Sequence, residues 1–257
     1  NAHHPRAPHL DGGGGDALGG GKVGRRREGR ETEESGGAER GGRDFYGTSV
    51  VALEAATGRP LWHFQTVHHD VWDYDIAAQP VLFEQASGKA GVITTTKMGH
   101  VFLLDRESGK PLFPVEERAV PQSTVPGEHT APTQPFPTLP RPLHPHSLAE
   151  DEIWGLTPID RKACREQFRQ LRYEGIFTPP GFDTTLAYPG LGGGMNWGSA
   201  SVNPVTNVMI VNSMRVPYTV QLRPREEAAT LDGNDQVGAN AQEGTPYIVI
   251  RGAYLSP

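Results

Sequence analysis

Short apolar runs, separated by glycine-containing turns, follow one another along most of this chain. The clearest runs outside the repeat described next are residues 80–83, 91–96, 199–204 and 208–212. Runs of this length between turn residues are typical of β-strands, because helices show longer stretches with a period near 3.6 residues. The 32 glycines and 23 prolines among 257 residues also favour turns over long helices. The pattern predicts an all-β fold.

A repeat organises these runs. Residues 52–62 match residues 103–113 at an offset of 51 residues. Each copy has an apolar strand, an acidic residue (Glu54 or Asp105), a Thr-Gly or Ser-Gly turn, and a second strand that ends in an aromatic residue. A period near 50 with several short strands in each unit is the signature of a β-propeller. Residues 199–212 suggest a third unit.

Two stretches interrupt the pattern. Residues 114–145 carry nine prolines, so we expect an extended or irregular surface loop. A short helix is predicted to start at Thr157, because Pro158 suits its first position and Asp160 stands where a capping-box acid belongs.

The first 43 residues differ in composition from everything after them. They hold 13 of the glycines, no aromatic residue and seven apolar ones, which is too little apolar surface to fold. We interpret residues 1–43 as a disordered Gly/Arg-rich tail, or as an out-of-frame reading of sequence that belongs to a preceding unit. Residues 44–257 form the predicted β-domain.

Charge and cysteine content exclude some functions. The net charge of -6 and the pI of about 5.9 argue against a nucleic-acid binder, which needs a basic surface. The single cysteine, Cys164, excludes an intrachain disulfide and a cysteine-based zinc cluster. The sequence contains no run of 18 consecutive apolar residues, so it predicts no membrane-spanning helix.

The most chemically suggestive stretch is residues 66–75, with three aspartates and two histidines among aromatic residues. Aspartate is depleted in strands, so one interpretation is a strand that ends in a polar, aromatic-walled site. The other is a turn capped by aspartate side chains and packed under Trp72. The spacing alone does not choose between them.

Five motifs in the same order resemble the membrane-bound quinoprotein glucose dehydrogenases, a group that also includes quinate and shikimate dehydrogenases. The resemblance covers about residues 44–225. The motifs are QTVHHDVWD at 65–73, KMGHVFLLDR at 97–106, PTQPF at 132–136, RYEGIFTPP at 172–180 and GGGMNWG at 192–198.

The resemblance implies an eight-bladed propeller with pyrroloquinoline quinone (PQQ) in its central channel beside a calcium ion. Asp73 matches the family's catalytic base, and Lys97 matches the lysine that hydrogen-bonds the quinone oxygens. Asn212 matches the family's asparagine that lies near the quinone. Asn196 and Trp197 occupy the place of a pair near the site, although the relatives often have Glu before the Trp.

His68 and His69 recur in the same motif, and we interpret them as hydrogen-bonded supports for Asp73. Calcium prefers oxygen ligands, so imidazoles suit it poorly, and we assign no metal ligand in this chain. The resemblance places the calcium ligands, and the Trp beneath the quinone, before Tyr46. The chain therefore reads as a fragment with about half of the propeller, the Pro-rich insertion and one short helix.

The function that the resemblance implies is PQQ-dependent oxidation of an aldose or polyol, with ubiquinone as the electron acceptor. By family, the protein would lie at the periplasmic face of the bacterial inner membrane, held by an N-terminal anchor that is missing from this chain. The alternative is a non-catalytic propeller fragment, or decayed remnant, that binds no cofactor. A third reading, a metal-binding β-domain unrelated to quinones, would require metal uptake without quinone.

Overall fold

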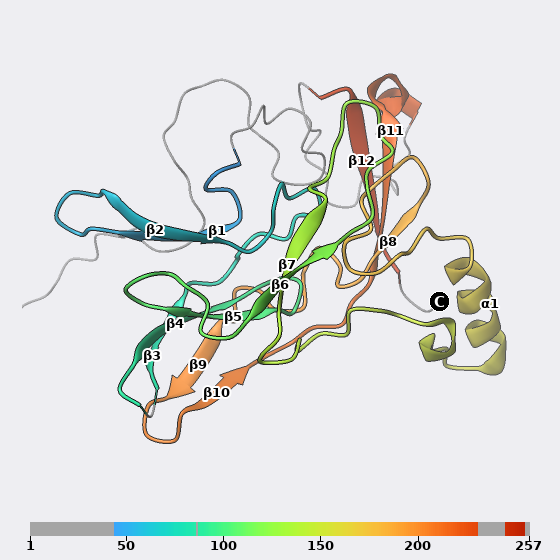
Figure 1. The fold of residues 1–257 in the computed structure, drawn as a ribbon. Helices are drawn as coiled ribbons and strands as arrows, with labels where there is room; N and C mark the ends of the chain where they lie inside the picture. The colour runs from blue at the N-terminus through green and yellow to red at the C-terminus, as the bar shows by residue number, and fades with distance from the viewer. Residues whose placement is uncertain (1–43, 86, 231–244, 255–257) are drawn as a thin grey trace, which may run out of the picture.

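The computed structural model describes residues 44–85, 87–230 and 245–254. Its strands are β1 (Ser49–Leu53), β2 (Pro60–Gln65), β3 (Val81–Glu84), β4 (Ala90–Thr95), β5 (Val101–Asp105), β6 (Val115–Ala119), β7 (Thr133–Pro137), β8 (Thr185–Ala187), β9 (Ala200–Asn203), β10 (Val208–Val211), β11 (Tyr218–Pro224) and β12 (Tyr247–Ala253). Within these residues they pair into five small antiparallel sheets, β1–β2, β3–β4–β5, β6–β7, β8–β11–β12 and β9–β10 (Figure 1). None of the sheets described closes on itself.

The predicted repeat is confirmed at the level of its turns. In the first copy the Gly58 N–H donates to the Glu54 carbonyl at 2.8 Å, and in the second the Gly109 N–H donates to the Asp105 carbonyl at 2.9 Å. Both glycines have a positive φ, 72° and 69°, which glycine adopts without steric cost. The two copies also touch, because the Trp62 ring lies where a Cβ on Gly109 would stand.

The other predicted strands are confirmed with one shortening. The runs near residues 80–83 and 91–96 become β3 and β4, and the proposed third unit becomes the β9–β10 hairpin. The return strand of the second repeat copy is reduced to one bridge between Leu104 and Pro111. Prolines at 111 and 114 cannot donate to a ladder, which explains why this strand is short.

The Pro-rich insertion is more ordered than its composition predicts. Instead of running as an irregular loop throughout, it contains β6 and β7, which pair from Val115 opposite Pro137 to Ala119 opposite Thr133. Proline is tolerated there because each strand of a two-stranded sheet has one edge that needs no hydrogen bonds. The prediction of an extended or irregular surface loop was therefore right about the extended backbone of these two segments and wrong in making them a loop, because they pair as strands.

The predicted helix is confirmed as α1 (Pro158–Phe168), which lies at one side of the molecule in Figure 1. The Thr157 hydroxyl accepts from the Asp160 N–H at 3.2 Å, and the Asp160 carboxylate accepts from the Thr157 N–H at 3.0 Å. This reciprocal pair satisfies two N–H groups that the first turn leaves without helical partners. Two short 3₁₀ helices, η2 (Glu150–Glu152) and η3 (Arg225–Thr230), were not predicted. No described helix has the length and apolar character needed to cross a membrane.

The apolar core is divided among several clusters. One of them joins the segment after β2 to residues 176–177, and it contains Trp72 and Tyr74. Another holds the inner faces of β1, β4 and β5. The segment that carries the three aspartates is therefore packed against the core on its aromatic side, which fixes the path of the chain around them.

Candidate functional site

The segment after β2 is a bent loop rather than a strand, and Asp70 shapes it. The buried Asp70 carboxylate accepts from the Trp72 N–H at 2.9 Å through Oδ1 and from the Tyr74 N–H at 2.8 Å through Oδ2. The Thr48 hydroxyl donates to Oδ2 at 3.3 Å. Of the two interpretations of residues 66–75, the aspartate-capped turn is confirmed for this part of the loop, and the extended strand is wrong because these bonds bend the backbone.

The same bend directs Asp73 and Asp75 toward Lys97. Asp73 has a φ of +65°, in the left-handed region that non-glycine residues rarely occupy. The Lys97 Nζ lies 3.3 Å from Asp73 Oδ1 and also forms an ion pair with Asp75 Oδ1. A residue held in a sparsely populated conformation is typical of functional sites, where the surrounding structure maintains it.

Burial differs among the three charged groups. The side chains of Lys97 and Asp73 are 9% and 15% exposed, whereas Asp75 is 41% exposed. Lys97 follows β4, in a turn closed by the Gly99 N–H, which donates to the Thr96 carbonyl at 2.9 Å. The sheet thus holds the ammonium group in place while the loop brings the carboxylates to it.

The glycine-rich loop of residues 192–198 packs directly on Lys97. A Cβ on Gly193 would stand 2.5 Å from Lys97 Cγ, and Gly193 has a φ of +68°, so only glycine suits this position. The Gly194 N–H donates to the Lys97 carbonyl. The loop therefore keeps Lys97 buried against the aspartates.

Burial dominates the pKa of Asp73, whereas ion pairing decides the net direction of the Lys97 pKa. Burial raises the pKa of Asp73 from 3.8 to about 7, although Lys97 and Arg251 act in the opposite direction; Asp75 adds to the increase. For Lys97 burial lowers the pKa, but Asp73 and Asp75 together outweigh it and the net pKa is raised. Lys97 is therefore a stable cation, while Asp73 exchanges its proton near neutral pH.

The structure brings Asp73 and Lys97 together, and Asn212 meets the same glycine-rich loop. The Asn212 side chain is exposed after β10, and a Cβ on Gly198 would stand 2.2 Å from its Oδ1. Asn196 shapes the loop, since its Nδ2 donates to the Gly192 carbonyl at 2.8 Å and its Oδ1 accepts from the Trp197 N–H at 2.8 Å.

The Trp197 side chain is 86% exposed. It therefore does not occupy a core position within the described residues. Its role beside a cofactor stays a prediction, as do the roles of Asn196 and Asn212.

His68 and His69 connect the loop to other segments. The His68 ring contacts the Gln65 side chain at 2.7 Å and Glu117 at 3.1 Å, and the His69 Nδ1 contacts Asp44. Both ring nitrogens of His68 contact these other side chains, so any support that His68 gives to Asp73 is indirect. The supporting role remains a prediction.

Two charged residues near Asp73 were not assigned to the site from the sequence. Asp75 is one of the three aspartates of residues 66–75 and was given no role in the site, yet it pairs with Lys97. Arg251 on β12 is buried and lowers the pKa of Asp73, but it lies far away in the sequence and no motif marked it.

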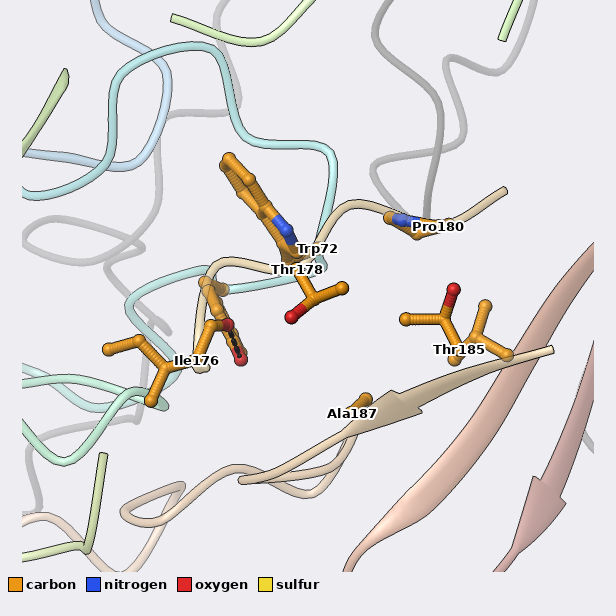
Figure 2. Close-up of a pocket in the computed structure, with 8 residues that line it drawn as sticks. Trp72, Ile176, Thr178, Pro180, Thr185 and Ala187 are labelled. Atoms are coloured by element: carbon orange, nitrogen blue, oxygen red, sulfur yellow. Dashed lines mark hydrogen bonds between the residues drawn. The ribbon is translucent and has the colours of Figure 1, made fainter. Parts of the chain in front are cut away.

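A small pocket lies behind the loop that carries Asp73 (Figure 2). It is lined by Trp72, Tyr74, Ile176, Thr178, Pro180, Thr185, Ala187 and Val220. The Tyr74 hydroxyl, one of the lining groups, donates to the Ile176 carbonyl at 2.6 Å. The lining contains no charged residue, so the pocket is not part of the ion-paired site of Asp73, Asp75 and Lys97.

Comparison with known proteins identifies the class. Residues 29–257 match the PQQ family model described as "Glucose/ethanol/alcohol dehydrogenase, beta-propeller domain". The chain belongs to this family, which confirms the predicted family and the β-propeller class of its fold.

Particular relatives are similar over most of the chain. A probable quinate dehydrogenase (quinone) of Xanthomonas campestris pv. juglandis is 42% identical over 82% of this chain and 28% of its own length. The quinoprotein glucose dehydrogenase of Escherichia coli K12 has the same identity and coverage. A glycerol dehydrogenase large subunit of Gluconobacter oxydans is 41% identical over 79% of this chain and 30% of its own length.

The chain thus spans less than a third of the length of these relatives. Among solved structures, a quinohemoprotein alcohol dehydrogenase from Comamonas testosteroni is similar at 22% identity and a TM-score of 0.41, over 82% of this chain and 25% of that one. Relatives with three different named substrates are about equally similar in sequence, so overall identity does not select among quinate, glucose and glycerol.

Proposed function

We propose that this chain supplies the proton-accepting and quinone-binding residues of a PQQ-dependent dehydrogenase that oxidises a sugar or polyol. The observation that carries the proposal is the buried pair of Asp73 and Lys97, 3.3 Å apart, in a member of a family of PQQ enzymes. A base and a fixed cation side by side are what removal of a hydroxyl proton beside an anionic acceptor requires.

Asp73 is the proposed general base. When bound, PQQ would supply the two-electron acceptor for the hydride of the carbinol carbon, and the Asp73 carboxylate would take the proton of the substrate hydroxyl. A pKa of about 7 suits this task, since the group is partly ionised at neutral pH and can still hold a proton. We expect the activity to rise with pH through about 7, as Asp73 becomes ionised.

Lys97 is the proposed cation for the quinone oxygens. An ammonium group has three N–H donors, and the ion pairs with Asp73 and Asp75 leave one for another acceptor. This donor set fits an anionic quinone. The close approach of Gly193 keeps the Lys97 side chain from swinging away from the site.

The glycine-rich loop completes the proposed contacts. Asn212 would offer an amide to the quinone, and the exposed indole of Trp197 offers a flat apolar face on which a planar ring system can stack. Asn196 would act indirectly, by fixing the backbone that presents Trp197.

The proposal also includes a calcium ion, an electron acceptor and a cellular location. Family membership supports a calcium ion beside PQQ, with ligands outside this chain, and ubiquinone as acceptor. On the resemblance to the membrane-bound quinoprotein dehydrogenases, we extend the proposal to a site at the periplasmic face of the bacterial inner membrane. The substrate class is that of the relatives' names, quinate, glucose and glycerol.

Reconstitution tests the proposal. The full chain is mixed with PQQ and Ca²⁺, and dye reduction is followed with glucose, quinate and glycerol in parallel. We expect substrate-dependent reduction that Asp73→Asn lowers by about 10²–10⁴-fold, the range for loss of a general base. The matched control is Asp183→Asn, at an exposed position away from the described ion pairs.

Two results would contradict the proposal. Equal losses in Asp73→Asn and Asp183→Asn would remove the special role of Asp73. A folded chain that takes up no PQQ would favour the alternative of a propeller fragment without cofactor.

A further inference from the structure

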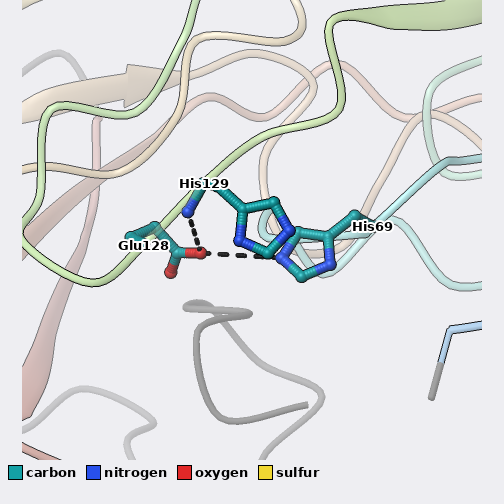
Figure 3. Close-up of side chains that lie close together, drawn as sticks. All are labelled: His69, Glu128 and His129. Carbon is teal, nitrogen blue, oxygen red and sulfur yellow. Dashed lines mark hydrogen bonds and ion pairs between the residues drawn. The ribbon is translucent and has the colours of Figure 1, made fainter. Parts of the chain in front are cut away.

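Three ligand groups from two loops meet on the side of the Asp73 loop that faces the β6–β7 connection. They are His69, which follows β2, and Glu128 and His129, which are consecutive between β6 and β7 (Figure 3). One ligand atom from each lies within 4.8 Å of the others. Two imidazoles and one carboxylate form a donor set that zinc and similar transition metals prefer.

The distances are close to those of a metal site. A tetrahedral zinc ion with bonds of about 2.0–2.1 Å holds its ligand atoms roughly 3.3 Å apart. The His69 Nε2 lies 3.7 Å from the Glu128 Oε1, and the rings of His69 and His129 have centroids 3.9 Å apart. The three ligand atoms lie within 4.8 Å of one another, so side-chain movements of up to about 1.5 Å would bring the donors to bonding positions.

A carboxylate behind His69 orients it as a ligand. The His69 Nδ1 contacts Asp44 Oδ2, and Nε2 faces Glu128. In the tautomer whose Nδ1 proton is donated to Asp44, Nε2 has the lone pair that a metal ligand needs. A carboxylate that accepts from the remote nitrogen of a histidine is the usual support for a metal-bound imidazole, because it fixes the tautomer and raises the basicity of the ligand. Both His69 and the Glu128 side chain are largely buried, at 8% and 6% exposure.

The loop that carries the other two ligands is ordered by its own hydrogen bonds. The Glu128 N–H donates to the Val125 carbonyl at 3.0 Å across Gly127, which has a φ of +81°. The Thr130 hydroxyl donates to the Pro121 carbonyl at 3.3 Å and accepts from the Ser123 N–H. The site is thus built on a turn with a defined shape.

We propose that His69, Glu128 and His129 bind a zinc-class divalent metal ion, with Asp44 as the residue that positions His69. Calcium does not suit this donor set, because it prefers oxygen ligands. The ion would join the loop after β2 to the β6–β7 connection and leave a coordination position for water. Since Asp73 lies four residues beyond His69, the metal would also stiffen the loop that carries the proposed base.

Metal binding by the full chain tests this proposal without PQQ or substrate. The chain is freed of metal with a chelator and titrated with Zn²⁺ by calorimetry, and with Co²⁺ to record its visible absorption. We expect one ion per chain at this site. Glu128→Gln and His129→Ala should each weaken Zn²⁺ affinity at least about 10-fold, and Asp44→Asn by about 10–100-fold through His69. The Co²⁺ band should shift in Asp44→Asn, which a merely structural role of Asp44 would not cause.

Controls separate this site from other imidazoles. His63→Ala changes a half-buried histidine on β2 outside the cluster and should leave the affinity unchanged. A variant with alanine at His3, His4 and His9 should also retain the ion. His129 is exposed, so His129→Ala is expected to fold, and far-UV circular dichroism checks this. No uptake of Zn²⁺, or uptake that Glu128→Gln and His129→Ala leave unchanged, would overturn the proposal.

Discussion

The turn of residues 96–100 contributes to two buried polar clusters. One cluster keeps charged groups by pairing them, and the other contains histidines that burial keeps neutral. In the first cluster Lys97 is paired with Asp73 and Asp75, so charge is kept by ion pairing. In the second cluster the fully buried His100 packs against Phe136 and the ring of His146, at centroid distances of 5.2 and 4.6 Å. Neither ring nitrogen of His100 has a hydrogen-bond partner among the described residues.

The two clusters show one physical effect with opposite signs. Burial disfavours the charged form, so it raises the pKa of Asp73 to about 7 and lowers the pKa of His146 to about 4. For His100 burial lowers the pKa well below its ordinary value, and His146 and Arg118 act in the same direction. The histidines of the second cluster are therefore neutral at pH 7. In the first cluster Lys97 stays protonated and pairs with the Asp73 carboxylate.

Removal of the cation should have the largest effect on this contrast. Lys97→Met leaves Asp73 buried without its partner, and we expect the free energy of unfolding at pH 8 to fall by about 2–4 kcal/mol. The loss should shrink at pH 5, where Asp73 can take up a proton. Urea denaturation at the two pH values measures both effects.

Lys89→Met is the matched control for this prediction. Lys89 pairs with Asp105 at 3.2 Å, but its side chain is 53% exposed, so its removal should cost no more than about 1 kcal/mol. Equal losses in the two variants would show that the buried cluster is no different from a surface ion pair.

Removal of the buried Asp73 carboxylate should change the free energy of unfolding less than Lys97→Met does, and in the stabilising direction. Between pH 3.8 and about 7 the folded chain holds the Asp73 proton that the unfolded chain has released, so stability falls as the pH rises through this window. Asp73→Asn removes this dependence and should stabilise the chain at pH 8 by about 1–3 kcal/mol. Thermal unfolding from pH 4 to pH 8 checks it; a destabilised variant at pH 8 would contradict a burial-dominated pKa.

The histidine cluster should give the smallest effect, on the acid side. The pKa of His146 falls from 6.5 to about 4 on folding, so the unfolded chain binds the proton first and stability is lost as the pH falls from 6.5 to 4. His146→Gln should reduce this loss by about 1–2 kcal/mol. Urea midpoints at pH 6.5 and pH 4.5 measure it, with His63→Gln as control. An unchanged acid loss would mean that His146 is not held neutral by burial.

Local patterns predicted much of the fold. The hairpin repeat, the β9–β10 unit and the capped helix at Thr157 depend on neighbouring residues, whose turn and capping chemistry is readable from the sequence. The β6–β7 pair was missed because its prolines argue against strands, and only the pairing of distant residues shows that an isolated two-stranded sheet accepts them.

The site was predicted in part. The resemblance placed Asp73 and Lys97 in one site, and the fold brings them within 3.3 Å. Asp75 and Arg251 could not be assigned because their roles depend on tertiary packing around Lys97 and Asp73. Two histidine groups, one around His100 and the other around His69 and His129, likewise form only when distant loops meet.

A PQQ titration of the full chain tests most directly whether the buried Lys97 ammonium group binds the quinone, as we propose. Equilibrium dialysis in the presence of Ca²⁺ would compare the unaltered chain with Lys97→Met and Lys89→Met. We predict saturable uptake that Lys97→Met weakens at least about 10-fold, the loss of one charge-assisted hydrogen bond, while Lys89→Met retains it. Equal uptake by Lys97→Met and the unaltered chain would contradict the claim.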